Sequence, residues 1–251
     1  MRTAFITGAT SGFGQAIAFR FAALGYNLIV TGRRENRLND LIEKLKSDYK
    51  IEILPLCYDV KDYNACQKAV ESLPEYFRHI DILINNAGLA AGTSPFQDSD
   101  LADYEVMIDT NVKGLIYMTK LIVPGMIEQQ SGHIVNISSI AGIEVYPTGS
   151  VYCASKHAVN AITKGLRIDL IKHGIKVSSV SPGMAETEFS IVRNHGDENK
   201  AKAVYNGLTP LNADDIADAV EYIVTRPAHV SINDIQINPA QQANTYIAHR
   251  N

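Results

Sequence analysis

A strand-like apolar run near the start of the chain, Ala4-Phe5-Ile6-Thr7, leads directly into the glycine-rich stretch Gly8-Ala-Thr-Ser-Gly12-Phe-Gly14. A helical pattern of apolar residues follows, and Gly25 is placed to end that helix. A dinucleotide pyrophosphate site requires this order of strand, glycine loop and helix, because glycines allow close backbone approach and a helix N-terminus presents free N–H groups to phosphate. The glycines are spaced G-x-x-x-G-x-G rather than G-x-G-x-x-G, so a plain turn between strand and helix stays open as an alternative.

A second apolar run, residues 27–31, ends in Gly32-Arg33-Arg34. In dinucleotide-binding folds an Asp or Glu about 20 residues past the glycine loop binds the adenosine ribose 2′-hydroxyl. This chain has two arginines there, and guanidinium groups bind a 2′-phosphate that a carboxylate would repel. The pattern therefore predicts NADP as the cofactor. The alternative is that Arg33 and Arg34 only begin the next helix on its solvent side.

The rest of the chain continues the alternation of strands and helices. Pro55 lies in the predicted strand 51–58 and restricts that strand to an edge of the sheet. Further predicted strands are 81–85, 133–138, 176–181 and 230–237, and predicted helices are 35–48, 101–130 (interrupted near Pro124) and 152–173. This alternation predicts an α/β fold, a Rossmann-type doubly wound parallel sheet of about seven strands with helices on both faces. We expect one domain, 1–251, with a substrate lid at about 184–207 and a tail, 239–251, that is either surface or an oligomer contact.

Polar and glycine residues follow most of the predicted strands directly. Open α/β sheets bind ligands at the edge formed by the carboxyl ends of their strands, so these residues are expected to meet there. They are the glycine loop, Arg33, Asp59-Val60, Asn85-Asn86-Ala87-Gly88, Ser139 and Pro182-Gly183.

Tyr152 and Lys156 lie four residues apart in a predicted helix, which places a phenol and an ammonium group on one face. A phenol titrates near pH ~10, and a cation held beside it lowers that pKa. Such pairs also occur by chance, so this one is informative only next to a cofactor site. Asn111 interrupts the apolar face of the 101–130 helix and is either a structural hydrogen-bonding residue or part of a site.

Composition restricts the partners and the compartment. The net charge is −4, from 23 basic and 27 acidic side chains, which argues against nucleic acid and anionic membranes as partners. Cys57, Cys66 and Cys153 lack CxxC or Cys/His spacing, and we expect reduced thiols and no metal site. No apolar segment approaches the length of about 18 residues needed to span a membrane, and no signal peptide is evident after Met1. A soluble, cytoplasmic protein is expected.

Taken together and in this order, the motifs resemble the short-chain dehydrogenase/reductase family of the single-domain type, across essentially the whole chain. The matching motifs are Thr7-Gly8-xxx-Gly12-x-Gly14, Asp59-Val60, Asn85-Asn86-Ala87-Gly88, Asn111, Ser139, Tyr152-xxx-Lys156 and Pro182-Gly183-xxx-Thr187. The resemblance implies a nicotinamide-dependent interconversion of a carbonyl and an alcohol without a metal. It also implies a homotetramer.

The same resemblance assigns roles to the site residues. It implies Tyr152 as the general acid/base and Lys156 as the group that lowers its pKa and holds the nicotinamide ribose. Ser139, rather than Ser138, is implied as the hydrogen-bond partner of the substrate oxygen, and Asn111 as the support of a water linked to Lys156. The implied NADP-binding residues are Gly8, Thr10, Ser11, Gly12, Phe13, Gly14, Arg33, Arg34, Asp59, Val60, Asn86, Ala87, Gly88, Tyr152, Lys156, Pro182, Gly183 and Thr187.

Finer features resemble bacterial NADP-dependent 3-hydroxy acid dehydrogenases that act on L-allo-threonine or serine. They are Asn-Ala-Gly-Leu-Ala at 86–90, Met-Ile-Asp-Thr-Asn-Val-Lys-Gly at 107–114, Thr-Glu-Phe-Ser-Ile-Val-Arg at 187–193 and Pro-Ala-His-Val-Ser-Ile-Asn at 227–233. This implies a small 3-hydroxy acid substrate such as L-allo-threonine, serine or 3-hydroxypropionate. Two alternatives are a reductase of uncharged ketones or aldehydes and a non-catalytic NADP-binding regulator. The presence of Ser139, Tyr152 and Lys156 together argues against the regulator.

A substrate carboxylate needs a cation when the lid excludes water, because an unpaired buried carboxylate is costly. Arg193 is the leading candidate, since its planar guanidinium fits a carboxylate. Ser139, Tyr152 and Arg193 are therefore the predicted substrate-binding residues. The alternative is that Arg193 faces solvent or pairs with Glu188, Asp197 or Glu198.

Overall fold

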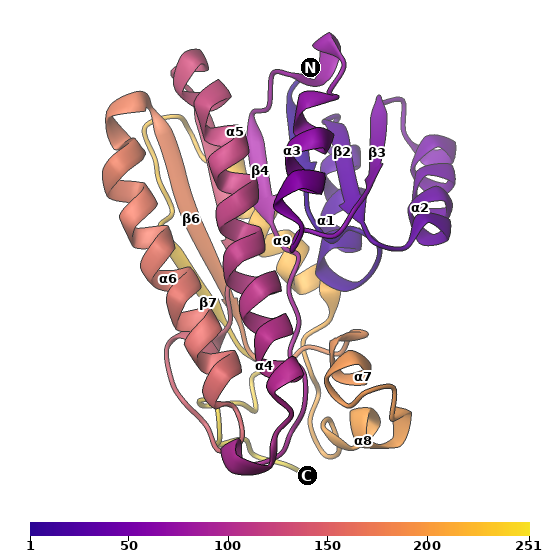
Figure 1. Cartoon of the computed structure of the whole chain (residues 1–251), viewed down its shortest axis with the longest axis vertical. Coiled ribbons are helices and arrows are strands. Elements are labelled where there is room, and N and C mark those ends of the chain that lie inside the picture. The colour runs from indigo at the N-terminus through magenta and orange to yellow at the C-terminus, as the bar shows by residue number, and fades with distance from the viewer.

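The computed structural model describes all 251 residues and contains one seven-stranded sheet in which every neighbouring pair is parallel (Figure 1). The strand order is β3-β2-β1-β4-β5-β6-β7, which confirms the predicted doubly wound fold. The strands are β1 (Thr3–Ile6), β2 (Asn27–Gly32), β3 (Ile53–Cys57), β4 (Ile82–Asn85), β5 (Gly132–Ile137), β6 (Ile175–Pro182) and β7 (Asp234–Ile237).

Helices follow the strands in the expected alternation. The α-helices are α1 (Gly12–Ala23), α2 (Glu35–Asp48), α3 (Tyr63–Glu71), α4 (Leu101–Ile108), α5 (Leu115–Gln129), α6 (Ser150–Leu170), α7 (Phe189–Arg193), α8 (Glu198–Ala203) and α9 (Ala213–Val224). Short 3-10 turns are η1 (Glu75–Phe77), η2 (Phe96–Asp98), η4 (Ile140–Gly142) and η5 (Ile171–His173), and η3 (Asp109–Gly114) is a π-helical turn. No helix has the length and apolar character needed to cross a membrane.

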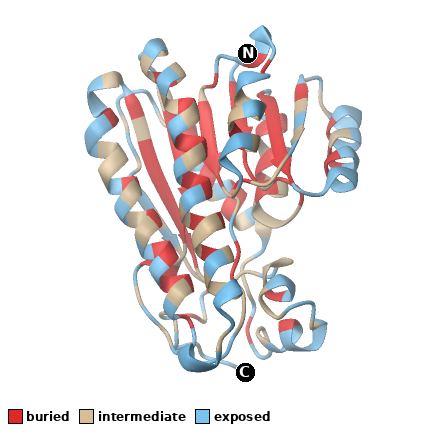
Figure 2. Ribbon diagram, viewed as in Figure 1, coloured by how far each residue is buried: buried red, intermediate tan, exposed pale blue.

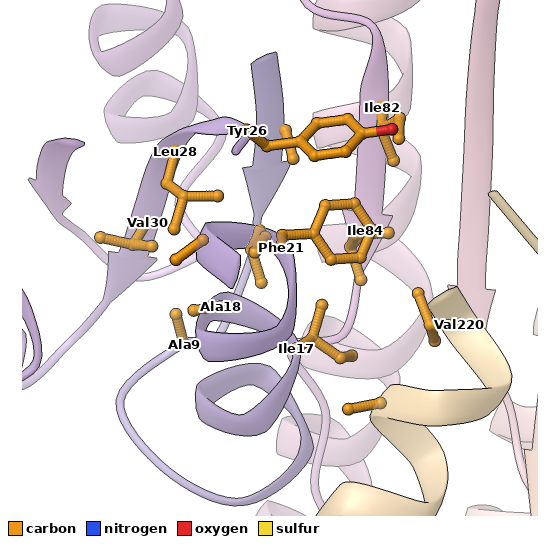
Figure 3. Packing of buried hydrophobic residues seen from close by; sticks show 14 of the residues in the cluster. Ala9, Ile17, Ala18, Phe21, Tyr26, Leu28, Val30, Ile82, Ile84 and Val220 are labelled. Atoms are coloured by element: carbon orange, nitrogen blue, oxygen red, sulfur yellow. The ribbon is translucent and has the colours of Figure 1, made fainter. Parts of the chain in front are cut away.

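The sheet is covered on both faces because its strands are apolar on both sides. Ile6 belongs to the core under α1, α2 and α9, whereas Phe5, one residue earlier, belongs to the core under α3 and α5. Phe21 of α1 packs against Tyr26 with ring centres 5.0 Å apart, and Figure 3 shows Phe21 beside Ile84 and Tyr26 beside Ile82, both of β4. In Figure 2 the central strands are buried, and the outer faces of the helices are exposed. This packing holds the carboxyl ends of the strands in fixed positions.

Two details of the sheet agree with the sequence and one does not. Pro55 lies on β3, which is an edge strand as predicted, so its missing N–H removes no bond inside the sheet. Asn212 caps α9 in a capping box with Asp215, as the sequence indicated. The last strand begins at Asp234 rather than at residue 230. The reason is that the N–H of Val230 closes a turn on the carbonyl of Pro227 and is not available to the sheet.

The predicted 101–130 helix is interrupted, but not at Pro124. Helix α5 runs through this proline. Pro124 has no N–H to donate to the carbonyl of Lys120, but both residues are exposed, so water can hydrogen-bond that carbonyl instead. The interruption lies instead at the π turn η3, which contains Asn111 and comes between α4 and α5. The prediction of a break near Pro124 was therefore wrong in position.

Candidate active site

Two adjoining cavities open along the carboxyl edge of the sheet, and the predicted site residues divide between them. The first, which we call the cofactor cavity, is lined by all of the predicted NADP-binding residues except Gly14, Pro182 and Gly183. Gly14 lies beneath the glycine loop, and Pro182 and Gly183 line the second cavity, which we call the substrate cavity. Tyr152 and Thr187 line both, so the two cavities meet at these residues.

The loops after β1 and β4 are built to admit a phosphate group. Gly8 has a φ of +66°, and a Cβ there would lie 2.9 Å from the Cα of Ala87. The Asn86 side chain joins the two loops, because its Nδ2 donates to the carbonyls of Thr7 and Gly8 at 2.9 and 3.0 Å. Ser11 precedes α1 without capping it, which leaves the first N–H groups of that helix free for an anion. These residues fit a dinucleotide pyrophosphate.

The arginines after β2 face the cofactor cavity, and acidic side chains lie beside them. Arg34 donates to the hydroxyls of Thr10 and Ser11 at 3.1 and 2.9 Å, so it lies over the glycine loop rather than on the solvent side of α2. Arg33 lies 3.6 Å from a carboxylate oxygen of Asp59 and is more exposed. Glu188 also contacts Arg34, at 2.9 Å. Asp59 is at the edge where the sequence placed it with Arg33, whereas the contact of Glu188 with Arg34 was not predicted.

Tyr152 and Lys156 lie on one face of α6, as their spacing predicted, and both are buried, at 8% and 6% exposed. Lys156 donates from Nζ to the carbonyl of Ile137 at 3.0 Å, which fixes its ammonium group at the end of β5. That nitrogen is 6.0 Å from the centre of the Tyr152 ring. The hydroxyl of Ser139 lies close enough to Tyr152 to oppose the rise in its pKa, and it donates to the carbonyl of Pro182 at 3.4 Å. The hydroxyl of Ser138 is directed to the carbonyl of Lys156 instead. The structure thus groups the three residues that the sequence selected.

Burial controls the pKa values of this group. It lowers the pKa of the Lys156 ammonium to about 8, because the charged form loses its hydration. It also raises the pKa of Tyr152 above its usual value, and Tyr146 adds to this, while the hydrogen bond from Ser139 partly opposes it. Desolvation of the phenolate is the main cause of the raised pKa of Tyr152, and the expected lowering of this pKa by Lys156 stays a prediction.

Asn111 is a structural hydrogen-bonding residue that also borders the site. Its side chain exchanges two hydrogen bonds with the backbone of Leu89, both 2.8 Å, and donates a third to Ser155 at 3.0 Å. These contacts join the loop after β4 to α6. A Cβ on Gly88 would lie 3.2 Å from Oδ1 of Asn111 and 3.5 Å from Nζ of Lys156, so a larger residue would be crowded there. The implied water between Asn111 and Lys156 stays a prediction.

Arg193 lines the substrate cavity together with Ser139 and Tyr152. The guanidinium of Arg193 lies over the ring of Tyr146, with 5.4 Å from Cζ to the ring centre. Arg193 forms no ion pair, so the predicted alternatives for its partner do not occur. Instead Glu188 pairs with Arg34 and Arg37, Asp197 pairs with Lys200, and Glu198 pairs with Lys202.

Several residues of the site were not identified from the sequence. Phe189 packs on Tyr152 with ring centres 5.7 Å apart, and Gln242, in the predicted surface tail, is only 6% exposed. The Gln242 side chain accepts from the N–H of Met184 at 2.8 Å and contacts the position a Gly183 Cβ would take. The tail thus forms a wall of the substrate cavity.

The fold and the site together define a dinucleotide-binding protein with a Ser–Tyr–Lys group at the junction of its two cavities. The family model described as "short chain dehydrogenase" matches residues 2–198, and the chain belongs to this family.

The chain is similar to several named proteins along nearly its whole length. It is 49% identical to "Sulfoacetaldehyde reductase 2" of Chromohalobacter salexigens over 95% of this chain and 94% of that protein. It is 44% identical to "NADP-dependent 3-hydroxy acid dehydrogenase YdfG" of Salmonella typhi over 95% of each. Among solved structures, "The Closed form of serine dehydrogenase complexed with NADP+" matches with a TM-score of 0.93 and 41% identity, over 99% of this chain and 100% of that one.

Proposed function

We propose that this protein is an NADP-dependent oxidoreductase that interconverts a small 3-hydroxy acid and its 3-oxo form by hydride transfer. The observation that carries the proposal is the position of Tyr152, which lies where the cofactor cavity meets a second cavity containing the unpaired cation Arg193. One cavity fits a dinucleotide and the other offers a charge for a small anion. The relatives named as serine and 3-hydroxy acid dehydrogenases support the same substrate class.

The protein's own residues supply the proton and position the substrate. A nicotinamide cofactor supplies or accepts the hydride when it is bound. Tyr152 gives its hydroxyl proton to the substrate oxygen during reduction and takes it back during oxidation, and Ser139 hydrogen-bonds the same oxygen. Lys156, which keeps its charge at neutral pH because its pKa is about 8, stabilises the phenolate left after proton transfer.

The choice of NADP rests on the arginines after β2. Arg33 and Arg34 both line the cofactor cavity, and Arg34 is already held over the glycine loop by Thr10 and Ser11. Two guanidinium groups at this place offer donors in the geometry that a 2′-phosphate accepts. The NADP-containing relative with 41% identity supports this choice.

A second candidate substrate is sulfoacetaldehyde, because the relative that is 49% identical is named for its reduction. A sulfonate and a carboxylate carry the same charge, and Arg193 can bind either. Both candidates are short chains with an anion at one end and the reacting carbon close to it. The substrate cavity agrees with this description, since Arg193 and Tyr152 both line it.

A substrate panel tests the function and separates the candidates. We expect NADPH-dependent reduction of sulfoacetaldehyde or 3-oxopropanoate, and NADP-dependent oxidation of serine, L-allo-threonine or 3-hydroxypropionate. The matched controls are propanal and 1-propanol, which have similar size and no charge, and we expect their kcat/KM to be at least about tenfold lower. Equal kcat/KM for the uncharged controls would indicate a general carbonyl reductase. No turnover of any compound, with NADPH still bound, would indicate a regulator.

We also infer a cytoplasmic homotetramer. Apolar side chains stand exposed on the outer helices, with Ile116 of α5 at 42% and Ile168 of α6 at 75%, which supports burial against other subunits. The three free cysteines are compatible with a reducing compartment. Light scattering of the purified protein tests the assembly, and the expected mass is four times the 27.5 kDa of one chain.

A further inference from the structure

One acidic side chain of the lid segment (residues 184–207) lies inside the cofactor cavity. Glu188 reaches α2, where its carboxylate contacts Arg34 at 2.9 Å and is also paired with Arg37. Its side chain is 35% exposed, so the pairs are partly shielded from water. The two arginines lower the pKa of Glu188, and the carboxylate is charged at neutral pH. A negative group therefore occupies the cationic end of the cofactor cavity.

Arg34 is held on two sides. One terminal nitrogen contacts Glu188, and the other donates to Thr10 and Ser11, which belong to the glycine loop. A 2′-phosphate that binds Arg34 in this position meets it where Glu188 contacts it. Like charges at this separation repel, so phosphate and carboxylate compete for the same guanidinium.

Glu188 has neighbours in the sequence that touch other parts of the site. Thr187 faces the glycine loop, because its Cβ is 3.4 Å from the position that a Cβ on Gly12 would take. Phe189 packs on the ring of Tyr152. Three consecutive residues thus contact the phosphate loop, the arginines and the catalytic tyrosine, and movement of Glu188 affects all three contacts.

We propose that Glu188 is a specificity-determining residue that competes with the 2′-phosphate for the arginines after β2 and is displaced by NADP but not by NAD. The inference rests on the proposed function, because it takes NADP as the cofactor. In this arrangement the 2′-phosphate takes over Arg34 and Arg37, and the start of the lid segment is released from α2. NAD has no group that replaces Glu188, so the contact between the lid segment and α2 persists.

Binding measurements on Glu188→Gln test the competition. The amide keeps the shape of the side chain and removes its charge, so we expect NADPH and adenosine 2′,5′-bisphosphate to bind about three- to tenfold more tightly. NADH and 5′-AMP lack the 2′-phosphate, and we expect their Kd to change less than about twofold. The matched control is Glu186→Gln, which makes the same charge change two residues away at an exposed position without an ion pair. Titration calorimetry gives all of these Kd values without turnover.

The outcomes separate this inference from the proposed function. If the wild-type protein binds NADPH no more tightly than NADH, the choice of NADP is wrong. If NADPH is preferred but Glu188→Gln equals Glu186→Gln, or binds NADPH more weakly, then Glu188 does not compete and the inference is overturned.

A second measurement needs no variant and so does not depend on its folding. Hydrogen exchange of residues 187–193 in the wild-type protein is followed with adenosine 2′,5′-bisphosphate and with 5′-AMP. We expect faster exchange only with the bisphosphate, because only it displaces Glu188. The same exchange with both nucleotides contradicts the displacement.

Discussion

The catalytic group and the lid segment are held in different ways. Tyr152 and Lys156 are less than a tenth exposed, and Lys156 is fixed by a hydrogen bond to a strand carbonyl inside the fold. The lid segment contacts the rest of the protein partly through exposed ion pairs, those of Glu188 with two arginines and of His195 with Asp103 at 3.1 Å. Backbone bonds also join it to the fold, among them one from the N–H of Gly92 to the carbonyl of Arg193 at 2.9 Å and one from the N–H of Glu186 to the carbonyl of Leu211 at 2.8 Å.

This difference separates chemistry from specificity. Exposed ion pairs contribute about 0 to 1 kcal/mol each, so the contacts of the lid segment can exchange for contacts with a ligand at little cost. Buried groups such as Lys156 cannot move without losing partners that nothing else replaces. The same catalytic group can therefore serve different substrates as the lid segment and the tail vary.

Replacing Tyr152 by Phe gives the largest expected effect and tests the buried side of the comparison. The ring and its packing on Phe189 remain, but the transferable proton is lost. We expect kcat to fall by at least ~10²-fold while NADPH binds with nearly unchanged Kd. The matched control is Tyr146→Phe, which removes a hydroxyl from the same cavity and should lower kcat less than about tenfold. Near-normal turnover of Tyr152→Phe would remove this residue from the acid/base role.

Much of the buried site could be predicted from the sequence because local patterns define it. The Tyr152–Lys156 spacing fixes a shared helix face, and Pro55 marks an edge strand through its missing N–H. Strand ends place polar residues at one edge in any fold of this class. These rules act over a few residues, so a single sequence is enough to apply them.

The parts that were missed depend on contacts between distant residues. Glu188 meets Arg34 across 154 positions, and Gln242 accepts a hydrogen bond from Met184 across 58. No periodic pattern marks such residues, because exposed charges and irregular segments carry no repeating signal. The rise in the pKa of Tyr152 could not be read from a local pattern either, since it depends on how completely the fold removes water. Sequence patterns thus predicted the sheet and the placement of the site residues, but not the ion pairs and pKa values around the two cavities.

Replacing Arg33 by Asp tests cofactor choice at a residue that does not contact Glu188. A carboxylate there, beside Asp59, opposes a 2′-phosphate, so we expect the Kd of NADPH to rise about ten- to a hundredfold. The Kd of NADH should change less than about threefold, because its ribose is uncharged at this point. Arg33→Met, which removes the charge without reversing it, should give an intermediate loss. Equal losses for both cofactors would contradict the role of Arg33.

Replacing Arg193 by Met tests whether the lid segment, rather than the buried catalytic group, recognises the charge of the substrate. The change keeps most of the side-chain length and removes the cation that lines the substrate cavity. We expect KM for serine or sulfoacetaldehyde to rise by about tenfold or more, from the loss of a charged hydrogen bond of about 1.5 to 3 kcal/mol, with little change for an uncharged alcohol. Arg226→Met, on the exposed surface, is the matched control and should leave both substrates unaffected. Parallel changes for charged and uncharged substrates would remove Arg193 from substrate binding.

Replacing Lys156 by Met gives the smallest expected effect in kcal/mol and shows what burial of the catalytic cation costs the fold. The folded-state pKa is about 8 and the ordinary value is 10.5, so the unfolded chain binds more protons between these pH values and stability rises with pH there. The penalty is fully present below pH 8, where it amounts to about 3 kcal/mol at most, and it disappears above pH 10.5. Met also loses the hydrogen bond to Ile137, worth about 1 kcal/mol.

We therefore expect Lys156→Met to unfold in urea with a free energy about 1 to 2 kcal/mol higher than the wild-type protein at pH 7, with the gain lost or reversed near pH 10.5. Lys164 lies exposed on the same helix, and Lys164→Met should change the free energy of unfolding by less than about 0.5 kcal/mol at both pH values. A variant of Lys156 that is less stable than the wild-type protein at pH 7 would show that the buried ammonium stabilises the fold. Burial of the catalytic Lys156 would then not lower the stability of the fold, and this part of the comparison with the lid segment would be wrong.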